Sequence, residues 1–359
     1  MKNYNLGRLF VLVCLIVLPT VSKAAIDEKM LKQAKLELAW QNAISLNAKE
    51  QVQRINVLGD NLYILTNANY LFCLDRNTGK LVFGIAVAEA GLPVSEPTVY
   101  KNTAYIVAAN KLIAMDLQQG AELYSKKIPF LVSSPAAVNA SYFYFAGKDN
   151  LMHASDTNSL REIFVASPSS KSDITSVMAT DDKVFFATQG GNLLCMAASG
   201  PKKIWQYDAV GTITAGLVKN GDWIYASGKD TNLYKLNAEN GDLAWKFRSG
   251  AILTQSARAT EKVVYQYAPL KGLFAVDANS GKQMWLLPEA VDLLAQDSNS
   301  NTAYIIGRNK ICTVMDNKLA KEIYTINFAS ITKFGVNTSD SKIYIMEGKN
   351  ISCIRPIKK

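Results

Sequence analysis

The chain has 359 residues, with 39 Lys and Arg against 30 Asp and Glu and a formal net charge of +9. This excess contains no dense Lys/Arg run, which argues against a nucleic-acid-binding surface. The only histidine is His153, and this excludes most catalytic and metal-binding schemes that need a positioned imidazole.

The N-terminal residues predict an export signal. Lys2 and Arg8 precede an apolar run over residues 9–21, and small residues then precede Ala25, as in a signal peptide. We expect residues 1–24 to be cleaved, which removes three basic residues and lowers the net charge to 9 − 3 = +6. Residues 25–35 form a short lead-in.

Two other readings of the N-terminus are weaker. The apolar run is shorter than the roughly 20 residues of a membrane-spanning helix, and Pro19 interrupts it. Lipid attachment at Cys14 would leave apolar residues on the mature end, and Val13 stands where a small residue would be needed. We therefore expect no transmembrane span in the mature chain.

Residues 36–359 contain a repeat of 39 to 41 residues. In each copy a β-like segment ends at a turn position, and this position usually carries an acidic or amide residue. The eight turn positions are Asp75, Asp116, Asp156, Ala197, Asn237, Asp277, Asp316 and Arg355. A period of this length with β-like alternation predicts one four-stranded propeller blade per copy.

A glycine follows four residues after the turn position in the best copies, as at Gly79 and Gly281. Asp and Asn side chains bond the backbone just ahead of them, and Gly accepts the positive φ of a tight turn. A calcium loop would need further oxygen ligands and a bidentate Glu, which do not follow here. The segment therefore predicts a β-turn.

Two columns of aromatic residues fix the register. The outer column lies eight residues after the turn position and comprises Phe83, Tyr124, Phe164, Trp205, Trp245, Trp285 and Tyr324. The inner column lies 11 or 12 residues before it and comprises Tyr63, Tyr105, Tyr144, Phe186, Tyr225, Tyr265, Tyr304 and Tyr344. Each aromatic can bury roughly 150–250 Å², enough to pack adjacent sheets together.

The last copy has no outer aromatic of its own, because its position falls beyond the last residue. Residues 36–40 end in Trp40 and resemble the segment that ends in Trp245. The N-terminus therefore predicts the outer strand of the last blade, which would leave no unpaired sheet edge. We expect an all-β, eight-bladed β-propeller of four antiparallel strands per blade, with its ring closed by an N-terminal strand. A solenoid would need distinct caps at both ends.

Small residues before the inner aromatics, over residues 133–138 and 213–216, indicate inner strands that crowd a central channel. Three of the mature cysteines, Cys73, Cys195 and Cys353, occupy the same repeat position. Equivalent positions in different blades are too far apart for a disulfide. We expect buried, free thiols.

The segment from Leu273 to Trp285 resembles the repeat of pyrroloquinoline-quinone (PQQ)-type propellers, and the resemblance covers residues 36–359. In size, export and blade number the chain is similar to the BamB-like periplasmic proteins. This resemblance implies a scaffold that helps outer-membrane β-barrels to fold. The repeat positions serve turns and packing, so they indicate the fold more strongly than the function.

No chemical motif stands out. Quinone-dependent dehydrogenases carry adjacent cysteines over the cofactor, whereas no two cysteines are adjacent here and Glu96 is a lone carboxylate among the inner segments. His153 occupies a strand position that is apolar in other copies, which favours a packed side chain. The Ser339-x-x-Lys342 and Gly190-Gly191-Asn192 strings are interpreted as turns. We expect no catalytic, cofactor-binding or metal-binding residues, no cofactor and no enzyme activity.

The first hypothesis is a non-catalytic periplasmic scaffold, peripheral to the outer membrane, that acts as a monomer within a protein complex. Its partners would be envelope proteins such as a barrel-assembly complex. The alternative is a small-molecule or quinone-binding propeller that uses its axial channel.

Overall fold

The computed structural model of the chain describes residues 26–168, 171–213 and 215–357. The expected signal peptide, residues 1–24, lies outside the described residues. The lead-in contains one short helix, α1 (Glu28–Gln33), whose N-terminus is capped by Asp27: its carboxylate accepts a hydrogen bond from the Lys29 backbone N–H at 2.8 Å.

Almost all other regular structure is β-strand, and the described strands form seven sheets. Six sheets have four strands each, in the order of the sequence. The first two are β6 (Thr98–Tyr100), β7 (Thr103–Ala108), β8 (Lys111–Asp116), β9 (Glu122–Lys127), and β10 (Ala137–Val138), β11 (Tyr142–Ala146), β12 (Met152–Asp156), β13 (Glu162–Ala166). The next two are β14 (Ile174–Ala179), β15 (Lys183–Thr188), β16 (Asn192–Ala197), β17 (Lys203–Asp208), and β18 (Val218–Asn220), β19 (Trp223–Ser227), β20 (Asn232–Asn237), β21 (Leu243–Arg248). The last two are β22 (Arg258–Ala259), β23 (Val263–Ala268), β24 (Gly272–Asp277), β25 (Gln283–Leu287), and β26 (Ala290–Gln296), β27 (Thr302–Gly307), β28 (Ile311–Asp316), β29 (Lys321–Asn327).

The seventh sheet has eight strands and joins the two ends of the chain. Its order is β1 (Leu36–Ala43), β32 (Asn350–Pro356), β31 (Ile343–Glu347), β30 (Lys333–Gly335), β2 (Val52–Leu58), β3 (Asn61–Thr66), β4 (Tyr70–Asp75) and β5 (Leu81–Ala86). The pairing in its middle, between β2 and β30, is parallel and consists of Ile55 opposite Gly335 alone. The other pairings in this sheet are antiparallel, including β1 with β32.

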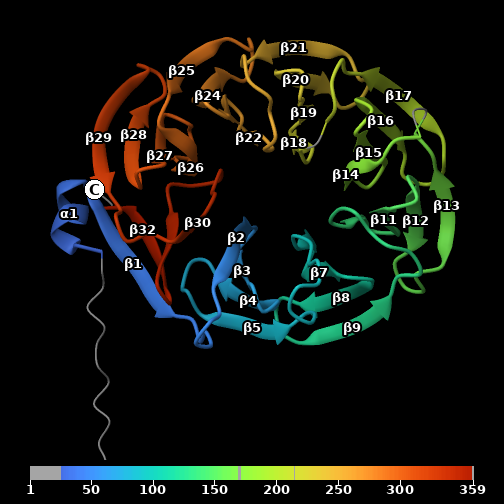
Figure 1. The fold of residues 1–359 in the computed structure, drawn as a ribbon, viewed down its shortest axis with the longest axis horizontal. Coiled ribbons are helices and arrows are strands. Elements are labelled where there is room, and N and C mark those ends of the chain that lie inside the picture. The colour runs from blue at the N-terminus through green and yellow to red at the C-terminus, as the bar shows by residue number, and fades with distance from the viewer. Residues whose placement is uncertain (1–25, 169–170, 214, 358–359) are drawn as a thin grey trace, which may run out of the picture.

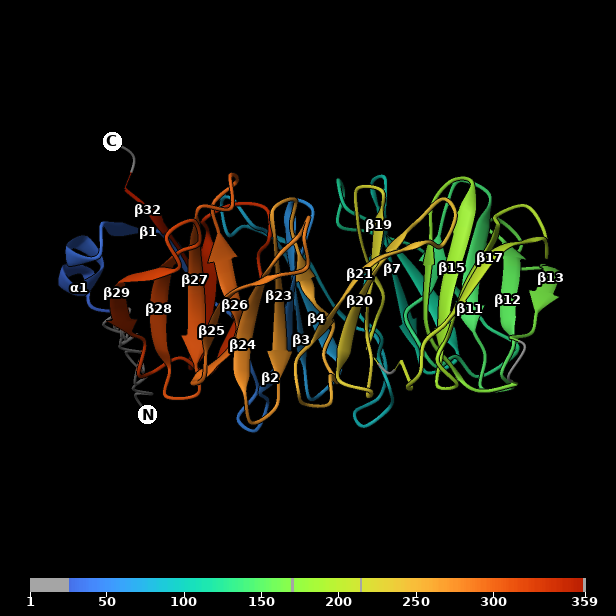
Figure 2. The same ribbon diagram turned by 90° about the horizontal axis from the view of Figure 1, so that it is seen from above.

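The sheets surround a central axis and make the fold a β-propeller (Figure 1). Strands such as β2, β22 and β26 lie toward the axis, and strands such as β9, β17 and β25 form the circumference. Seen edge-on, the strands run between the two faces of a disc (Figure 2). The hydrophobic core lies between neighbouring sheets: one cluster joins Leu193 of β16 to Leu236 of β20, as expected when each sheet buries both faces.

The inner strands are shorter than the sequence predicts. Residues 133–138 contribute only Ala137–Val138 to a strand, and β18 begins at Val218, after the expected segment 213–216. A backbone group there bonds to the preceding sheet instead: the Leu217 N–H donates to Ser176 Oγ of β14 at 3.0 Å. Crowding around the axis thus replaces part of the strand ladder with bonds between sheets.

Candidate functional site

The seams between sheets are built from the outer aromatic column. Trp205 Nε1 donates to the Ala238 carbonyl oxygen, and Trp245 Nε1 donates to the Ala278 carbonyl oxygen, both at 3.0 Å. Each acceptor is the residue that follows the turn position of the next sheet. An indole therefore fastens each of these outer strands to the following sheet by a hydrogen bond as well as by packing.

Side chains of the inner column bond to the same turn regions of the neighbouring sheets. Asn317 accepts from Trp285 Nε1 at 3.0 Å through Oδ1, and its Nδ2 donates to Tyr265 Oη at 2.7 Å. At another seam, Tyr144 Oη donates to the Ala198 carbonyl oxygen at 2.7 Å. Members of the two columns predicted as packing positions therefore also satisfy backbone carbonyls, or the Asn317 side chain, at the turn of the neighbouring sheet.

The predicted aromatic positions are mostly buried. Those with exposures below 9% are Tyr63, Phe83, Tyr144, Phe186, Trp205, Tyr225, Tyr265, Trp285, Tyr304 and Tyr344, and Trp245 lies at 9%. Partly exposed members are Trp40, Tyr105, Tyr124, Phe164 and Tyr324. In the fourth repeat Phe185, and not Phe186, pairs with Cys195 and packs 6.0 Å from Trp205. Phe186 faces the preceding sheet in a cluster with Tyr144.

A small residue separates the two columns within a sheet. Cys73 pairs with Tyr63 on one side and with Phe83 on the other, and Cys or Ala fills this position in most repeats. Lys235 is an exception: it is buried, and its Nζ donates to the Ala278 carbonyl oxygen and lies 3.9 Å from the ring centroid of Trp223. The cation–π contact offsets part of the cost of burying this charge.

Glycine at the turn makes room for the indole. Gly241 has φ +77°, and a β-carbon there would lie 2.7 Å from atoms of the Trp205 ring. Gly281 is placed in the same way against Trp245. The sequence predicted the positive φ, while the close approach of an indole from the preceding sheet is a second requirement for glycine.

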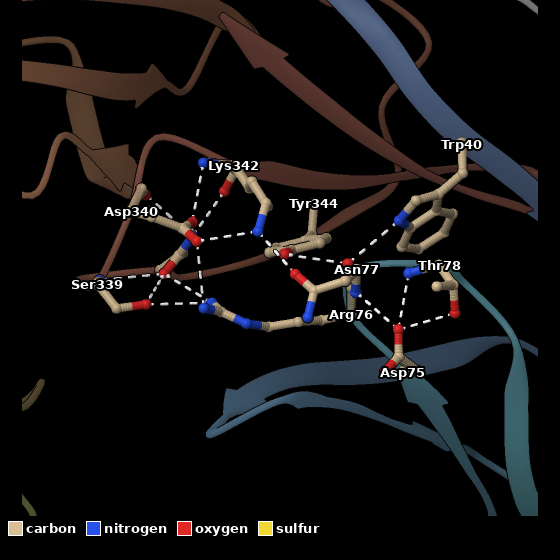
Figure 3. Close-up of polar contacts among 10 residues, drawn as sticks. Trp40, Asp75, Arg76, Asn77, Thr78, Ser339, Asp340, Lys342 and Tyr344 are labelled. Atoms are coloured by element: carbon tan, nitrogen blue, oxygen red, sulfur yellow. Dashed lines mark hydrogen bonds and ion pairs between the residues drawn. The ribbon is translucent and has the colours of Figure 1, made fainter.

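Trp40 occupies the same position at the seam between the N-terminal and C-terminal repeats (Figure 3). Its Nε1 donates to the Arg76 carbonyl oxygen at 3.1 Å, and its ring lies 6.2 Å from that of Tyr344. Tyr344 Oη donates to the same carbonyl at 3.2 Å. A β-carbon on Gly79 would lie 2.6 Å from the Trp40 ring, so this seam repeats the geometry of the others.

This seam also carries a polar clasp, formed by Arg76, Asn77, Asp340 and Lys342 (Figure 3). Arg76 Nη2 bonds Asp340 Oδ2 at 3.1 Å, and Lys342 Nζ bonds Asn77 Oδ1 at 2.7 Å. Burial alone would raise the pKa of Asp340, but hydrogen bonds from Asn337 and Lys342 and the charge of Arg76 leave that pKa below its usual value. The carboxylate is therefore stabilised in its ionised form.

Asp340→Asn is expected to make folding less sensitive to acid. A carboxylate whose pKa is lowered by folding stabilises the protein fully above its unfolded pKa of about 3.9, and loses that contribution as the pH falls through the lower folded value. Between pH 6 and pH 3 the free energy of unfolding of the wild type should therefore fall by about 1 kcal/mol more than that of the variant. This is the magnitude expected for a partly exposed ion pair. Urea unfolding at both pH values measures this, and equal losses would contradict it.

The four described cysteines, Cys73, Cys195, Cys312 and Cys353, are buried and free, which confirms the prediction. Burial raises the pKa of Cys73, Cys195 and Cys353 to about 12 and also raises the pKa of Cys312. Thiols held in the protonated form are poor nucleophiles and poor metal ligands.

A cavity of about 630 Å³ lies among the inner strands and is lined by charged residues. Arg258 binds Asp292 through two nitrogens, at 3.1 and 2.8 Å. Arg54 Nη2 donates to the Val94 carbonyl oxygen at 2.8 Å, and Glu96 also lines the space. Of these residues, the sequence indicated only Glu96. Arg54 and Arg258 could not be recognised, because the equivalent positions of the other repeats carry no common residue.

Comparison with known proteins agrees with the repeat. The model of the family described as outer membrane protein assembly factor BamB matches residues 30–175 and 165–339. The chain belongs to this family.

Two solved structures share the fold. BamB from Moraxella catarrhalis aligns with a TM-score of 0.64 and 12% identity, over 88% of this chain and 100% of the other. The computationally designed Ika8 protein aligns with a TM-score of 0.67 and 12% identity, over 89% and 100%. None of the curated proteins compared with the chain matches it. At this identity the structural likeness concerns the fold, because one propeller fold carries many functions.

His153 is a buried, packed side chain, as predicted from its strand position in the repeat. Its ring stacks on Phe130 at 3.8 Å between centroids, Nδ1 lies 2.7 Å from Glu162 Oε2, and Nε2 lies 3.0 Å from Asp149 Oδ2. Both ring nitrogens are therefore used within the fold. They link β12 to Glu162 of β13 and to Asp149 in the preceding turn, while the face of the ring packs against Phe130.

The Ser339-x-x-Lys342 and Gly190-Gly191-Asn192 strings lie in turns, as predicted. Ser339 Oγ bonds Asn337 Oδ1, while Lys342 Nζ bonds Asn77 and Asp340. Gly190 and Gly191 connect β15 to β16. Within the described ranges, no group of three His, Cys, Asp or Glu side chains could hold a metal ion. The same residues include no helix of the length and apolarity needed to cross a membrane.

Proposed function

We propose that the propeller has eight blades and that residues 36–359 form one closed domain. The eight-stranded sheet then counts as two blades, β1 with β30–β32 and β2–β5, because a single parallel residue pair joins its halves. Trp40 supports closure by the N-terminal strand, since it bonds the Arg76 carbonyl as Trp245 bonds that of Ala278.

We further propose that the protein is a non-catalytic scaffold for outer-membrane protein assembly. The observation that carries this proposal is the match to the assembly-factor family over residues 30–175 and 165–339. The described chemistry agrees with it: the thiols are buried and protonated, and His153 is bonded on both sides. These groups stabilise the fold and leave the loops at the two faces for partner proteins.

The proposed location is the periplasm, at the periphery of the outer membrane. The family description and the leader-like residues 1–24 support it. The predicted export signal would deliver the chain across the inner membrane and be removed before Ala25.

A second candidate is a small-molecule or quinone-binding propeller. The axial cavity favours it, because about 630 Å³ is large enough for a small ligand and two arginines line the wall. Both arginines already bond protein oxygens, Asp292 for Arg258 and Val94 for Arg54. We therefore rank this candidate below the scaffold.

Affinity capture tests the scaffold. The full chain with a C-terminal tag is expressed in its native cells, and envelopes are solubilised in mild detergent. We expect subunits of the barrel-assembly complex to co-purify and the captured protein to begin at Ala25. The same tag on an unrelated exported protein is the control. Recovery of the tagged chain without any barrel-assembly subunit would overturn the assembly role.

A further inference from the structure

Leu270 stands out on the hairpin between β23 and β24. Its side chain is 91% exposed, and its backbone has φ +65°. The left-handed region is unfavourable for a bulky residue. The other hairpins of this kind place no large aliphatic residue there: their left-handed residues are Asn69, Ala109, Asn150, Gly191, Thr231, Lys310 and Gly348. An exposed leucine in a conformation that Asn or Gly adopts more easily points to a role outside the fold.

Two more aliphatic side chains lie on adjoining loops. Val210 is 91% exposed and Ile252 is 51% exposed. The loop of Val210 bonds the hairpin between β19 and β20, where the Lys229 N–H donates to the Thr212 carbonyl at 2.9 Å. The other side of that hairpin accepts from the Ser249 N–H at the Thr231 carbonyl.

The last loop of this series reaches Leu270. Gln266 Nε2 on β23 donates to the Gln255 carbonyl at 3.1 Å, which ties the loop of Ile252 to the strand before the hairpin. Lys271 Cε lies 3.8 Å from where a β-carbon of Gly250 would stand. Four neighbouring segments thus form one continuous surface, the rim ridge: residues 209–212, 228–232, 249–253 and 268–272.

The rim ridge is cationic as well as apolar. Lys229 and Lys271 are exposed, and neither forms an ion pair within the described part of the chain. Asp230 lies between them in sequence, but its carboxylate accepts from Tyr234 Oη and Asn232 Nδ2. Its charge is directed into the fold, which leaves the lysines to meet a partner.

We propose that the rim ridge binds the surface of a bilayer that contains anionic phospholipids. Lysines on the ridge would contact the headgroups while Leu270, Val210 and Ile252 enter the interface between headgroups and acyl chains. Protein-binding hot spots are enriched in Trp, Tyr and Arg, whereas Leu, Val and Lys are not. The aliphatic-and-lysine composition of the loop tips therefore fits lipid better than a protein partner.

This inference deepens the proposed peripheral location and sets an orientation. The hairpin between β23 and β24 and the connections that leave the outer strands lie at one end of the antiparallel sheets. Binding through the rim ridge would place that face of the disc on the membrane. The opposite face, with the turns that follow Asp277 and Asp316, would stay free for proteins.

Vesicle co-sedimentation of the purified mature chain tests the proposal. Mixed phosphatidylcholine–phosphatidylglycerol vesicles are compared with phosphatidylcholine alone. We expect Leu270→Asn to lower the partition coefficient on mixed vesicles about tenfold, since it removes one inserted leucine. Asn tolerates the left-handed backbone, so the variant should fold at least as well as the wild type, which thermal unfolding checks.

Two further variants separate the contributions. Lys229→Gln with Lys271→Gln should remove the preference for phosphatidylglycerol, and added salt should do the same to the wild type. Leu319 is 68% exposed in the turn between β28 and β29, on the opposite face; Leu319→Asn is the matched control and should bind like the wild type.

Unchanged vesicle binding by Leu270→Asn, or no binding by the wild type, would overturn the proposal. If Leu270→Asn binds vesicles normally but loses barrel-assembly subunits in the affinity capture, the ridge is a protein-binding surface and the lipid proposal is wrong. The vesicle assay contains no other protein, so its failure leaves the scaffold proposal intact. Failure of the capture likewise leaves a positive vesicle result standing.

Discussion

Trp40→Ala is expected to lower the free energy of unfolding by about 3 kcal/mol, in the range for large-to-small changes at packed aromatic sites. The variant removes the indole that packs on Gly79 and Tyr344 and leaves the Arg76 carbonyl with one donor fewer. It also exposes the pairing of β1 with β32, which joins the two ends of the chain. Urea unfolding followed by tryptophan fluorescence or circular dichroism measures the loss.

Two further variants are needed to interpret the loss measured for Trp40→Ala. Trp40→Phe keeps an aromatic ring but loses the indole donor and part of the ring contact, so it should cost less than Trp40→Ala, with about 1 kcal/mol of the loss due to the hydrogen bond. Trp245→Ala removes the equivalent side chain at an internal seam, where the indole bonds the Ala278 carbonyl. If Trp245→Ala is costly and Trp40→Ala is not, the N-terminal strand does not close the ring.

The repeat made the fold predictable because each blade solves the same packing problem. The spacing of the turn positions located the hairpins before β5, β21 and β25, and the aromatic columns located the seams. The choice between Phe185 and Phe186 was not predictable in this way, because two adjacent aromatics in a strand face opposite sides. Only the pairing of Phe185 with Cys195 decides it.

Hydrogen bonds and ion pairs between blades could not be predicted from the sequence pattern. Trp285 and Tyr265 could be assigned to a core, but their shared partner Asn317 lies in the next sheet and is buried at 2% exposure. An Asn after a turn position looks like ordinary turn chemistry. The polar clasp could not be predicted either, because Arg76 and Asp340 are 264 positions apart in the chain and Arg76 is followed by a turn of common composition.

The exposed residues of the rim ridge could not be predicted from the sequence either. Leu270 is in the sequence one more apolar residue beside a proline, and Val210 and Ile252 lie in other loops earlier in the chain. Their exposure and the left-handed backbone of Leu270 depend on loops that meet only in the folded ring. Repeat periodicity carries no information about such loops, because they vary independently of the core.

Gly241→Ala is expected to lower the free energy of unfolding by about 3 kcal/mol. A left-handed backbone costs a non-glycine residue roughly 1–2 kcal/mol, and overpacking at a tight contact adds about 1–3 kcal/mol, because the new β-carbon would lie 2.7 Å from the Trp205 ring. Gly221→Ala is the matched control: its φ is +57°, but nothing lies within 4 Å of the added β-carbon. It should show the backbone cost alone, about 1 kcal/mol. Equal losses in the two variants, measured by urea unfolding, would mean that the indole does not press on the turn, and the seam would then owe its stability to the Trp205 hydrogen bond and to the remaining ring contacts.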